Sequence, residues 1–210
     1  MKVARFAFLS GLFLYGGIAV AQDSSRLGFE TGVSTLGAYV APTYEVNDKF
    51  SLRAPLHFGS ADQEFEFEGN TVDGTFGVTN GTLMADFSPW ATAFRVSGGL
   101  GIGGYKATGS VTDIVLDGVT YAGASSVAIQ QKQNVAPVLS IGFAKEFNNG
   151  FTVFADLGGR ITSYEVSVQT EAALTDAEQA DLDESVATIN NDLSKIWATP
   201  FVTIGLGYKF

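Results

Sequence analysis

The last nine residues, V-T-I-G-L-G-Y-K-F at positions 202–210, alternate between large apolar residues and small or polar ones. The large apolar residues are Val202, Ile204, Leu206, Tyr208 and Phe210. A two-residue period of this kind predicts a β-strand with one apolar face. The ends of soluble domains usually fray, so a terminal strand with such a face points to an apolar environment around it.

The same period recurs along the chain. It is found at 27–33, 36–46, 50–59, 80–87, 94–105, 135–147 and 151–164. With the C-terminal run these segments make eight strands, an even number that suits antiparallel closure. Short turns at 47–49, 88–93 and 148–150 alternate with long connections at 60–79, 107–134 and 166–197. The expected fold is therefore all-β: an eight-stranded antiparallel barrel with its short turns at one end.

The apolar set is expected to face outward, where hydrocarbon would make a mid-plane Lys or Arg cost about 2–4 kcal/mol. In the second strand this set begins at Leu36. Two hairpins should place Val46 opposite Phe50 and Phe147 opposite Phe151. Outward aromatic residues gather at the short-turn end: Tyr44, Phe50, Phe87, Phe94, Phe143, Phe147, Phe151, Tyr208 and Phe210. The alternative is the packed core of a soluble β-sandwich.

The opposite face of the strands carries charges of both signs. The expected lumen charge network consists of Glu45, Arg53, His57, Asp86, Arg95, Glu146, Asp156 and Arg160. Glu30, Tyr39, Tyr164 and Lys209 share the inward register. An eight-stranded lumen is narrow enough for side chains to fill, so ion pairs should plug it. The alternative is a narrow, gated conduit.

Strand register predicts individual pairs in this network. Asp86 should face Arg95 across the 88–93 turn, and Arg53 lies diagonal to Glu45. Asp156 and Arg160 lie two inward positions apart on one strand. His57 is expected to hydrogen-bond to a carboxylate or a tyrosine inside the lumen.

The final strand resembles the C-terminal signature of outer-membrane barrels through Val202, Ile204, Leu206, Tyr208 and Phe210. Residues 22–210 as a whole are similar to the small eight-stranded class that includes the outer-membrane protein A transmembrane domain and outer-membrane protein X. The resemblance implies that this strand is read by the barrel-insertion machinery and then closes against the first strand. It also implies a monomer in a Gram-negative outer membrane, surrounded by lipid and lipopolysaccharide at the cell surface.

The N-terminal segment predicts export. Lys2 and Arg5 precede a mostly apolar stretch at 6–20, and Ala19-Val20-Ala21 forms a small-residue cleavage site. Residues 1–21 are therefore expected to be a cleaved signal peptide, with the mature barrel beginning at Gln22. The alternative is a short transmembrane anchor.

Composition excludes several functions. The chain has no Cys, a single His and a net charge of -10. No disulfide or thiolate metal site is possible, and nucleic-acid binding is not expected because phosphates need clustered Lys and Arg. The glycine run at 98–104 lies in a strand pattern with no following helix, so it is not a phosphate-binding loop. We predict no catalytic residue, no cofactor and no bound metal.

Two long connections have features of their own. Glu64, Glu66 and Glu68 alternate with phenylalanines and predict a hairpin with its tip at 70–74. This acidic strip is either a solvated face or a divalent-cation site at the lipopolysaccharide surface. The insert at 174–196 predicts a helix, because Thr175 and Glu178 form a capping box. Its apolar stripe is Leu182, Val186, Ile189, Leu193 and Ile196; it either packs on the barrel rim or serves as a lid or partner-binding element.

Four prolines conflict with continuous strands, because proline cannot donate to a ladder. Pro137 and Pro200 are expected near strand starts, and Pro42 and Pro55 at bulges. The function expected from all these features is structural or surface-interactive. The first alternative is a narrow porin-like channel resembling outer-membrane protein W, and the second is a lipid-modifying barrel enzyme that would use His57.

Overall fold

The computed structural model describes residues 26–67, 70–90, 93–116, 119–170 and 174–210. The predicted signal peptide at 1–21 and the expected mature start at Gln22 lie outside these residues. Among the helices of the described ranges, none is both long and apolar enough to span a bilayer.

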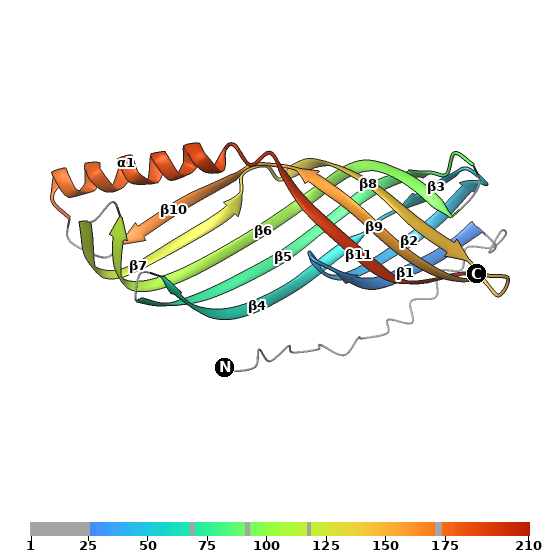
Figure 1. The fold of residues 1–210 in the computed structure, drawn as a ribbon, viewed down its shortest axis with the longest axis horizontal. Coiled ribbons are helices and arrows are strands. Elements are labelled where there is room, and N and C mark those ends of the chain that lie inside the picture. Colours follow the sequence, from blue (N-terminus) through green and yellow to red (C-terminus); the bar gives the residue numbers. More distant parts are fainter. Residues whose placement is uncertain (1–25, 68–69, 91–92, 117–118, 171–173) are drawn as a thin grey trace.

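Eleven strands form one antiparallel sheet that closes on itself (Figure 1). The strands are β1 (Leu27–Ser34), β2 (Gly37–Asn47), β3 (Phe50–Arg53), β4 (Leu56–Phe67), β5 (Asn70–Phe87), β6 (Phe94–Leu116), β7 (Val119–Gln131), β8 (Val135–Glu146), β9 (Phe151–Ile161), β10 (Tyr164–Thr170) and β11 (Ala198–Lys209), with helix α1 (Asp176–Leu193) before β11. β3 and β4 are two halves of one wall strand, and β7 and β10 lie outside the ring. The ring therefore has eight strands, in the order β1, β2, β3/β4, β5, β6, β8, β9, β11, which confirms the predicted fold.

The ring closes between β1 and β11, as the resemblance to outer-membrane barrels implies. Their register runs from Gly28 opposite Lys209 to Ser34 opposite Thr203. The Phe210 amide also donates to the Leu27 carbonyl at 2.9 Å. Gly32 is required at this seam, because a Cβ there would lie 2.1 Å from the Ile204 carbonyl oxygen. The weak strand pattern at 27–33 is thus a full wall strand.

Pro42 and Pro55 meet where the third wall strand is broken. β2 pairs with β3 from Thr43 opposite Arg53, and with β4 from Val40 opposite Leu56. The Pro42 carbonyl accepts from the Ala54 amide at 3.0 Å. The prediction of bulges at these prolines is wrong: the register is the same on both sides of them, so they lie at one interruption of the ladder with no inserted residue. Pro137 and Pro200 lie third in their strands, as predicted.

The two hairpins differ in how well the sequence predicted them. Asn47, not Val46, is opposite Phe50, because a register shift follows Glu45. The Asn47 side chain accepts from the Phe50 amide, which stabilises the tighter turn. At the other hairpin the Phe147 amide donates to the Phe151 carbonyl at 2.8 Å, as predicted. Gly150 there has φ +79°, which favours glycine.

The outward face is apolar, as predicted from the strand period. We call the following exposed side chains of the barrel wall the outer belt: Leu27, Phe29, Val33, Tyr44, Phe50, Leu52, Leu56, Phe58, Leu83, Phe87, Val96, Leu100, Ile102, Val135, Leu139, Ile141, Phe143, Val153, Leu157, Val202, Ile204, Leu206 and Tyr208. Leu36 is an exception, and its predicted outward position is wrong. It lies in the turn between β1 and β2 and is buried inside, packed with residues such as Met84 and Phe201, because a turn residue is free of the strand alternation.

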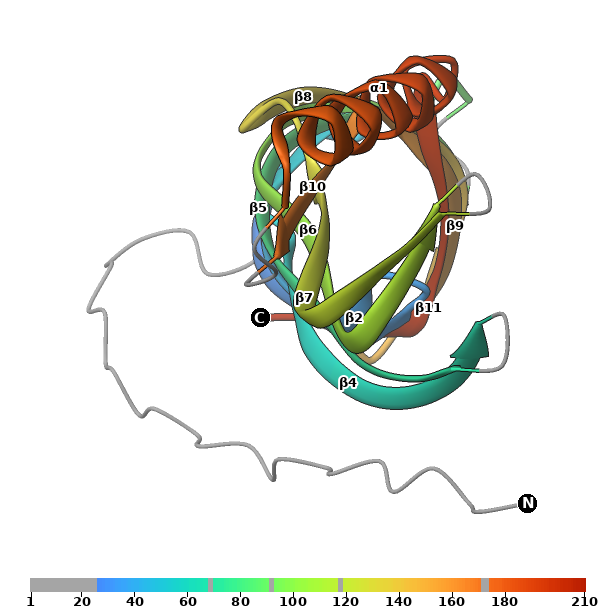
Figure 2. The same ribbon diagram turned by 90° about the vertical axis from the view of Figure 1, so that its left-hand side faces the viewer.

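The wall extends well beyond the ring at the end with the long connections (Figures 1 and 2). The connections predicted at 60–79 and 107–134 are mostly strand: the distal parts of β4, β5 and β6, together with β7. The connection at 166–197 contains the end of β10 and helix α1. The hairpin tip predicted at 70–74 is wrong, because Asn70 pairs with Phe67 and Gly74 with Gln63. Glu68 and the side chains of Glu64 and Glu66 lie outside the described part of the acidic strip.

Helix α1 begins where the capping box predicts. The Thr175 hydroxyl accepts from the Glu178 amide, and the Glu178 carboxylate accepts from the Thr175 amide. These bonds lower the pKa of Glu178, so they stabilise the first turn above the ordinary Glu pKa and are lost as the pH falls through the lowered value.

The helix packs beside β10, along the wall (Figure 2). The Asn190 side chain forms a pair of hydrogen bonds with the backbone of Val166, at 2.7 and 3.0 Å. Leu182 is buried, but Ile196 lies beyond the helix end and is exposed. α1 thus covers part of the free edge of β10.

Candidate functional site

Five buried charged side chains meet inside the barrel. Glu30 comes from β1, Arg53 from β3, Asp86 from β5, Arg95 from β6 and Asp156 from β9. Each residue is at most 6% exposed. Each occupies an inward position of its strand, and the register of the closed ring brings the five side chains to one level. We call these five residues the ion network.

Asp156 is the centre of the network. It accepts from Arg53 Nη1 at 2.8 Å, and from Arg95 Nη2 at 2.7 Å and Nε at 3.0 Å. Arg95 Nη1 also reaches Glu30 at 2.8 Å, and Arg53 Nε reaches Asp86 at 2.9 Å. Two planar guanidinium groups thus link three carboxylates through short charge-assisted bonds.

Neutral groups complete the network. The Tyr39 hydroxyl donates to Glu30 at 2.8 Å, and Arg53 Nη2 donates to the Ser97 hydroxyl at 3.1 Å. The Phe154 ring lies 5.4 Å from the Arg95 guanidinium carbon. A buried charge is tolerated when it is paired and hydrogen-bonded, and both arginines meet that condition.

The ion network crosses the lumen rather than following its wall. β3 and β9 are four places apart in the ring of eight strands, and so are β6 and β1. The Arg53–Asp156 and Arg95–Glu30 pairs therefore each join opposite walls. Two such crossings at one level place buried, bonded side chains in the middle of the barrel.

A hollow lies on each side of the network. Toward the short turns, the inner vestibule has a volume of about 110 Å³ and is lined by residues such as Glu45, Glu146 and Lys209. Lys209 pairs with Glu45 there and lies 3.6 Å from Glu146. Toward the long connections, the outer cavity has a volume of about 20 Å³ and is lined by residues such as His57 and Arg160. That space is close to what one water needs.

His57 faces the outer cavity, but its partner differs from the expected one. Its Nδ1 donates to the Asn80 side-chain oxygen at 3.2 Å, instead of to a carboxylate or a tyrosine hydroxyl. The Tyr39 ring contacts it edge-on, with centroids 5.2 Å apart. Asn80 lies directly opposite His57 on β5, which explains this pair.

Of the three charge pairs predicted from the sequence, one forms and two do not. Asp86 and Arg95 do approach, but only to 4.0 Å. The pair of Arg53 with Glu45 is wrong, because Arg53 turns to the network and Glu45 to Lys209. The pair of Asp156 with Arg160 is also wrong: four strand residues span about 13 Å, and Arg160 Nη2 donates to the Gly103 carbonyl instead.

Three members of the site are missing from the charge network expected from the sequence. Glu30 has the inward register, but it belongs to a strand with a weak pattern. Tyr39 is also inward, and nothing in the sequence marks its hydroxyl as a partner of Glu30. Ser97 carries no charge to single it out. The inward register of each residue is the only sequence signal that could have found them.

No protein-family model and no curated protein sequence matches this chain. Two solved structures from Acinetobacter baumannii do. CarO is 21% identical with a TM-score of 0.59, and CarO2 is 20% identical with a TM-score of 0.60. Each comparison covers 88% of this chain and 98% of the other. The chain has the fold of a small outer-membrane β-barrel.

This small outer-membrane-type barrel also matches a major outer membrane protein from Thermus thermophilus, at 14% identity and a TM-score of 0.44 over 88% of this chain and 98% of that one. The likeness to the two Acinetobacter structures concerns the fold alone.

Proposed function

We propose that the chain is an integral outer-membrane protein with a structural or surface-interaction role, and that its lumen is closed. The ion network carries this proposal. Its two cross-lumen pairs fill the middle of the barrel with buried, mutually bonded side chains. Moving a solute past that level would require breaking several short charge-assisted bonds.

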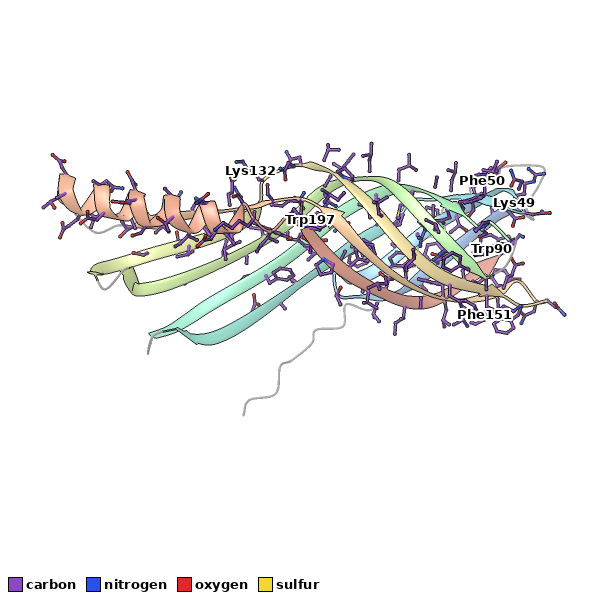
Figure 3. The ribbon with its side chains drawn as sticks, turned by 45° about the horizontal axis from the view of Figure 1, so that its top comes forward. Lys49, Phe50, Trp90, Lys132, Phe151 and Trp197 are labelled. Carbon is purple, nitrogen blue, oxygen red and sulfur yellow. The ribbon has the colours of Figure 1, made fainter. Side chains whose placement is uncertain are left out.

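The outer belt supports a membrane location. Its exposed side chains form a continuous apolar wall, whereas soluble proteins rarely expose large contiguous apolar patches. Trp90 and Phe151 lie at the short-turn end, and Trp197 lies near the other end of the ring, close to Lys132 (Figure 3). Aromatic and basic residues at both boundaries are typical of a bilayer-spanning barrel. The bilayer would then be an outer membrane with lipopolysaccharide, reached through the insertion machinery and occupied by a monomer.

The extended wall supports a role at the surface. The distal parts of β4, β5 and β6, with β7, β10 and α1, project beyond the ring at the end opposite the short turns (Figure 1). Six acidic residues of α1 face solvent: Asp176, Glu178, Asp181, Asp183, Glu184 and Asp192. An outer-membrane orientation with short periplasmic turns would present this sheet and helix outside the cell.

Conductance tests the closed lumen. We expect the purified protein to give no steady single-channel steps in planar bilayers at neutral pH. The charge-neutral double variant Arg53→Ala/Asp86→Ala should conduct, because it removes one cross-lumen arginine and one of its partners. The matched control Lys195→Ala/Asp192→Ala removes an exposed pair at the C-terminal end of α1 and should stay silent. Steady conductance of the unmodified protein would contradict a closed lumen.

A narrow gated channel is the second candidate. The observation in its favour is the hollow on each side of the ion network, with volumes of about 110 and 20 Å³. In this alternative the network is a gate between two water-filled spaces. Steps in the unmodified protein that disappear when residues 175–196 are deleted would favour it.

We further propose that the barrel is not an enzyme. His57 has Asn80 as its hydrogen-bond partner, and a nucleophile needs its base within hydrogen-bond reach. In the described part of the chain, no hydroxyl or carboxylate is bonded to this imidazole. Cells with the intact chain and cells with His57→Ala should give identical lipid A mass spectra. A modified lipid A species that requires His57 would overturn this proposal.

A further inference from the structure

Arg160 differs from the other two lumen arginines. Its side chain projects from β9 into the outer cavity, and the residue is 1% exposed. Arg53 and Arg95 each bind carboxylates at 2.9 Å or less. Arg160 forms no ion pair with any residue in the described ranges. Its Nη2 donates to the Gly103 carbonyl, while Nε and Nη1 are buried and unbonded.

Other unbonded polar atoms surround the same cavity. They are Asn80 Nδ2, Tyr105 Oη, Ser140 Oγ and His57 Nε2. All four residues are at most 6% exposed. Four of the five side chains, counting Arg160, have a donor to offer; neutral His57 offers an acceptor, because its Nδ1 proton goes to Asn80. The cavity is therefore rich in donors and carries a positive charge.

An unpaired buried guanidinium and unpaired buried donors are both unfavourable. A bound anion would relieve both at once, since it accepts from several donors and balances the charge. The space of about 20 Å³ suits one particle of about the size of water. A halide, as a single atom, is closer to that size than a carboxylate with its carbon and two oxygens.

We propose that the outer cavity is a binding site for a single halide ion, held by Arg160 with Asn80, Tyr105 and Ser140 as neighbouring donors. Water alone would satisfy donors and acceptors but would leave the guanidinium charge unbalanced. The remaining competitor is the ion network, whose three carboxylates exceed its two guanidiniums by one negative charge. Asp156 lines the same cavity, so its field could balance Arg160 without any ion.

Bromide distinguishes a bound halide from a water molecule and from charge balance by the ion network alone. Crystals of the full chain grown in sodium bromide should show an anomalous peak beside the Arg160 guanidinium, because bromide scatters anomalously and water does not. The peak should be absent in crystals of Arg160→Met. A density feature without an anomalous signal in the unmodified protein would mean that water fills the cavity, and would overturn the proposal.

A solution measurement covers the case in which the variant does not crystallise. Raising sodium bromide should raise the urea midpoint of unfolding from vesicles for the unmodified protein, because a ligand of the folded state stabilises it. Lys132→Met, which removes an exposed cation near the rim, should keep the whole shift. Arg160→Met should lose it and retain only the general salt effect. Equal shifts in all three proteins would overturn the proposal, whatever the outcome of the conductance test.

Discussion

Asp156→Ala should destabilise the barrel by about 3–5 kcal/mol, the usual result of removing one partner from a buried ion network. Asp156 accepts three bonds of 2.7–3.0 Å from Arg53 and Arg95. In this variant Glu30 and Asp86 still contact the arginines, but Arg53 and Arg95 each lose their shortest bond to a carboxylate. Reversible urea unfolding from lipid vesicles measures the loss.

The control for this prediction is the same change at the surface. Asp192→Ala removes a carboxylate whose pair with Lys195 is exposed, at 70% for the lysine side chain and 67% for the aspartate. Exposed pairs contribute about 0.2–1 kcal/mol, so the expected change is small. A comparable loss in both variants would mean that the ion network contributes no more than a surface pair.

A double-mutant cycle separates the interaction energy of Arg95 with Asp156 from the cost of the side-chain volume that each substitution removes. Arg95→Met alone leaves three carboxylates facing Arg53, and Asp156→Ala alone leaves two guanidiniums facing two carboxylates. The double variant removes one charge of each sign, so it should cost clearly less than the sum of the single changes. Strict additivity would contradict the bonded geometry at Asp156.

The wall of the barrel was predictable because the strand period is a local signal. The alternation of Val202, Ile204 and Leu206 sets which face each residue takes, and the structure follows it. Departures occur where backbone geometry competes with that period. Leu36 leaves the pattern in a turn, and Pro55 divides a wall strand without disturbing the faces of Leu52 and Leu56.

The extension beyond the ring was harder to predict. Residues 107–116 and 119–131 are strand, yet their apolar alternation is broken: Gly123 and Ser125 interrupt the face that carries Val119, Tyr121, Val127 and Ile129. A strand with an interrupted apolar face lacks the contrast on which periodicity depends. The helix, by contrast, was identified from its capping box because Thr175 and Glu178 are a local pair.

The lumen pairs were less predictable for a geometric reason. Register places residues of neighbouring strands side by side, and it led to the wrong pairs of Arg53 with Glu45 and of Asp156 with Arg160. Long side chains in a narrow barrel instead reach the opposite wall, as Arg53 reaches Asp156. That distance depends on strand tilt and closure, which no single segment encodes.

Ile141→Arg should cost about 2–4 kcal/mol of unfolding free energy in lipid vesicles, if the outer belt contacts hydrocarbon as proposed. Ile141 is 51% exposed and lies near the middle of β8 (Val135–Glu146). Arginine would keep the outward direction of the side chain. Its charge would then lie near the centre of the bilayer, where neither water nor a carboxylate can pair with it.

Val135→Arg is the matched control for this change. Val135 is on the same strand and the same face, with a similar exposed fraction of 55%, but it begins β8 at the edge of the ring. Near a boundary the cost of arginine falls to about 0–1 kcal/mol, because the side chain reaches the interface. A much larger loss of unfolding free energy for Ile141→Arg than for Val135→Arg would therefore reflect depth in a bilayer rather than lost packing. Equal costs, or a neutral Ile141→Arg, would mean that the belt faces something other than lipid.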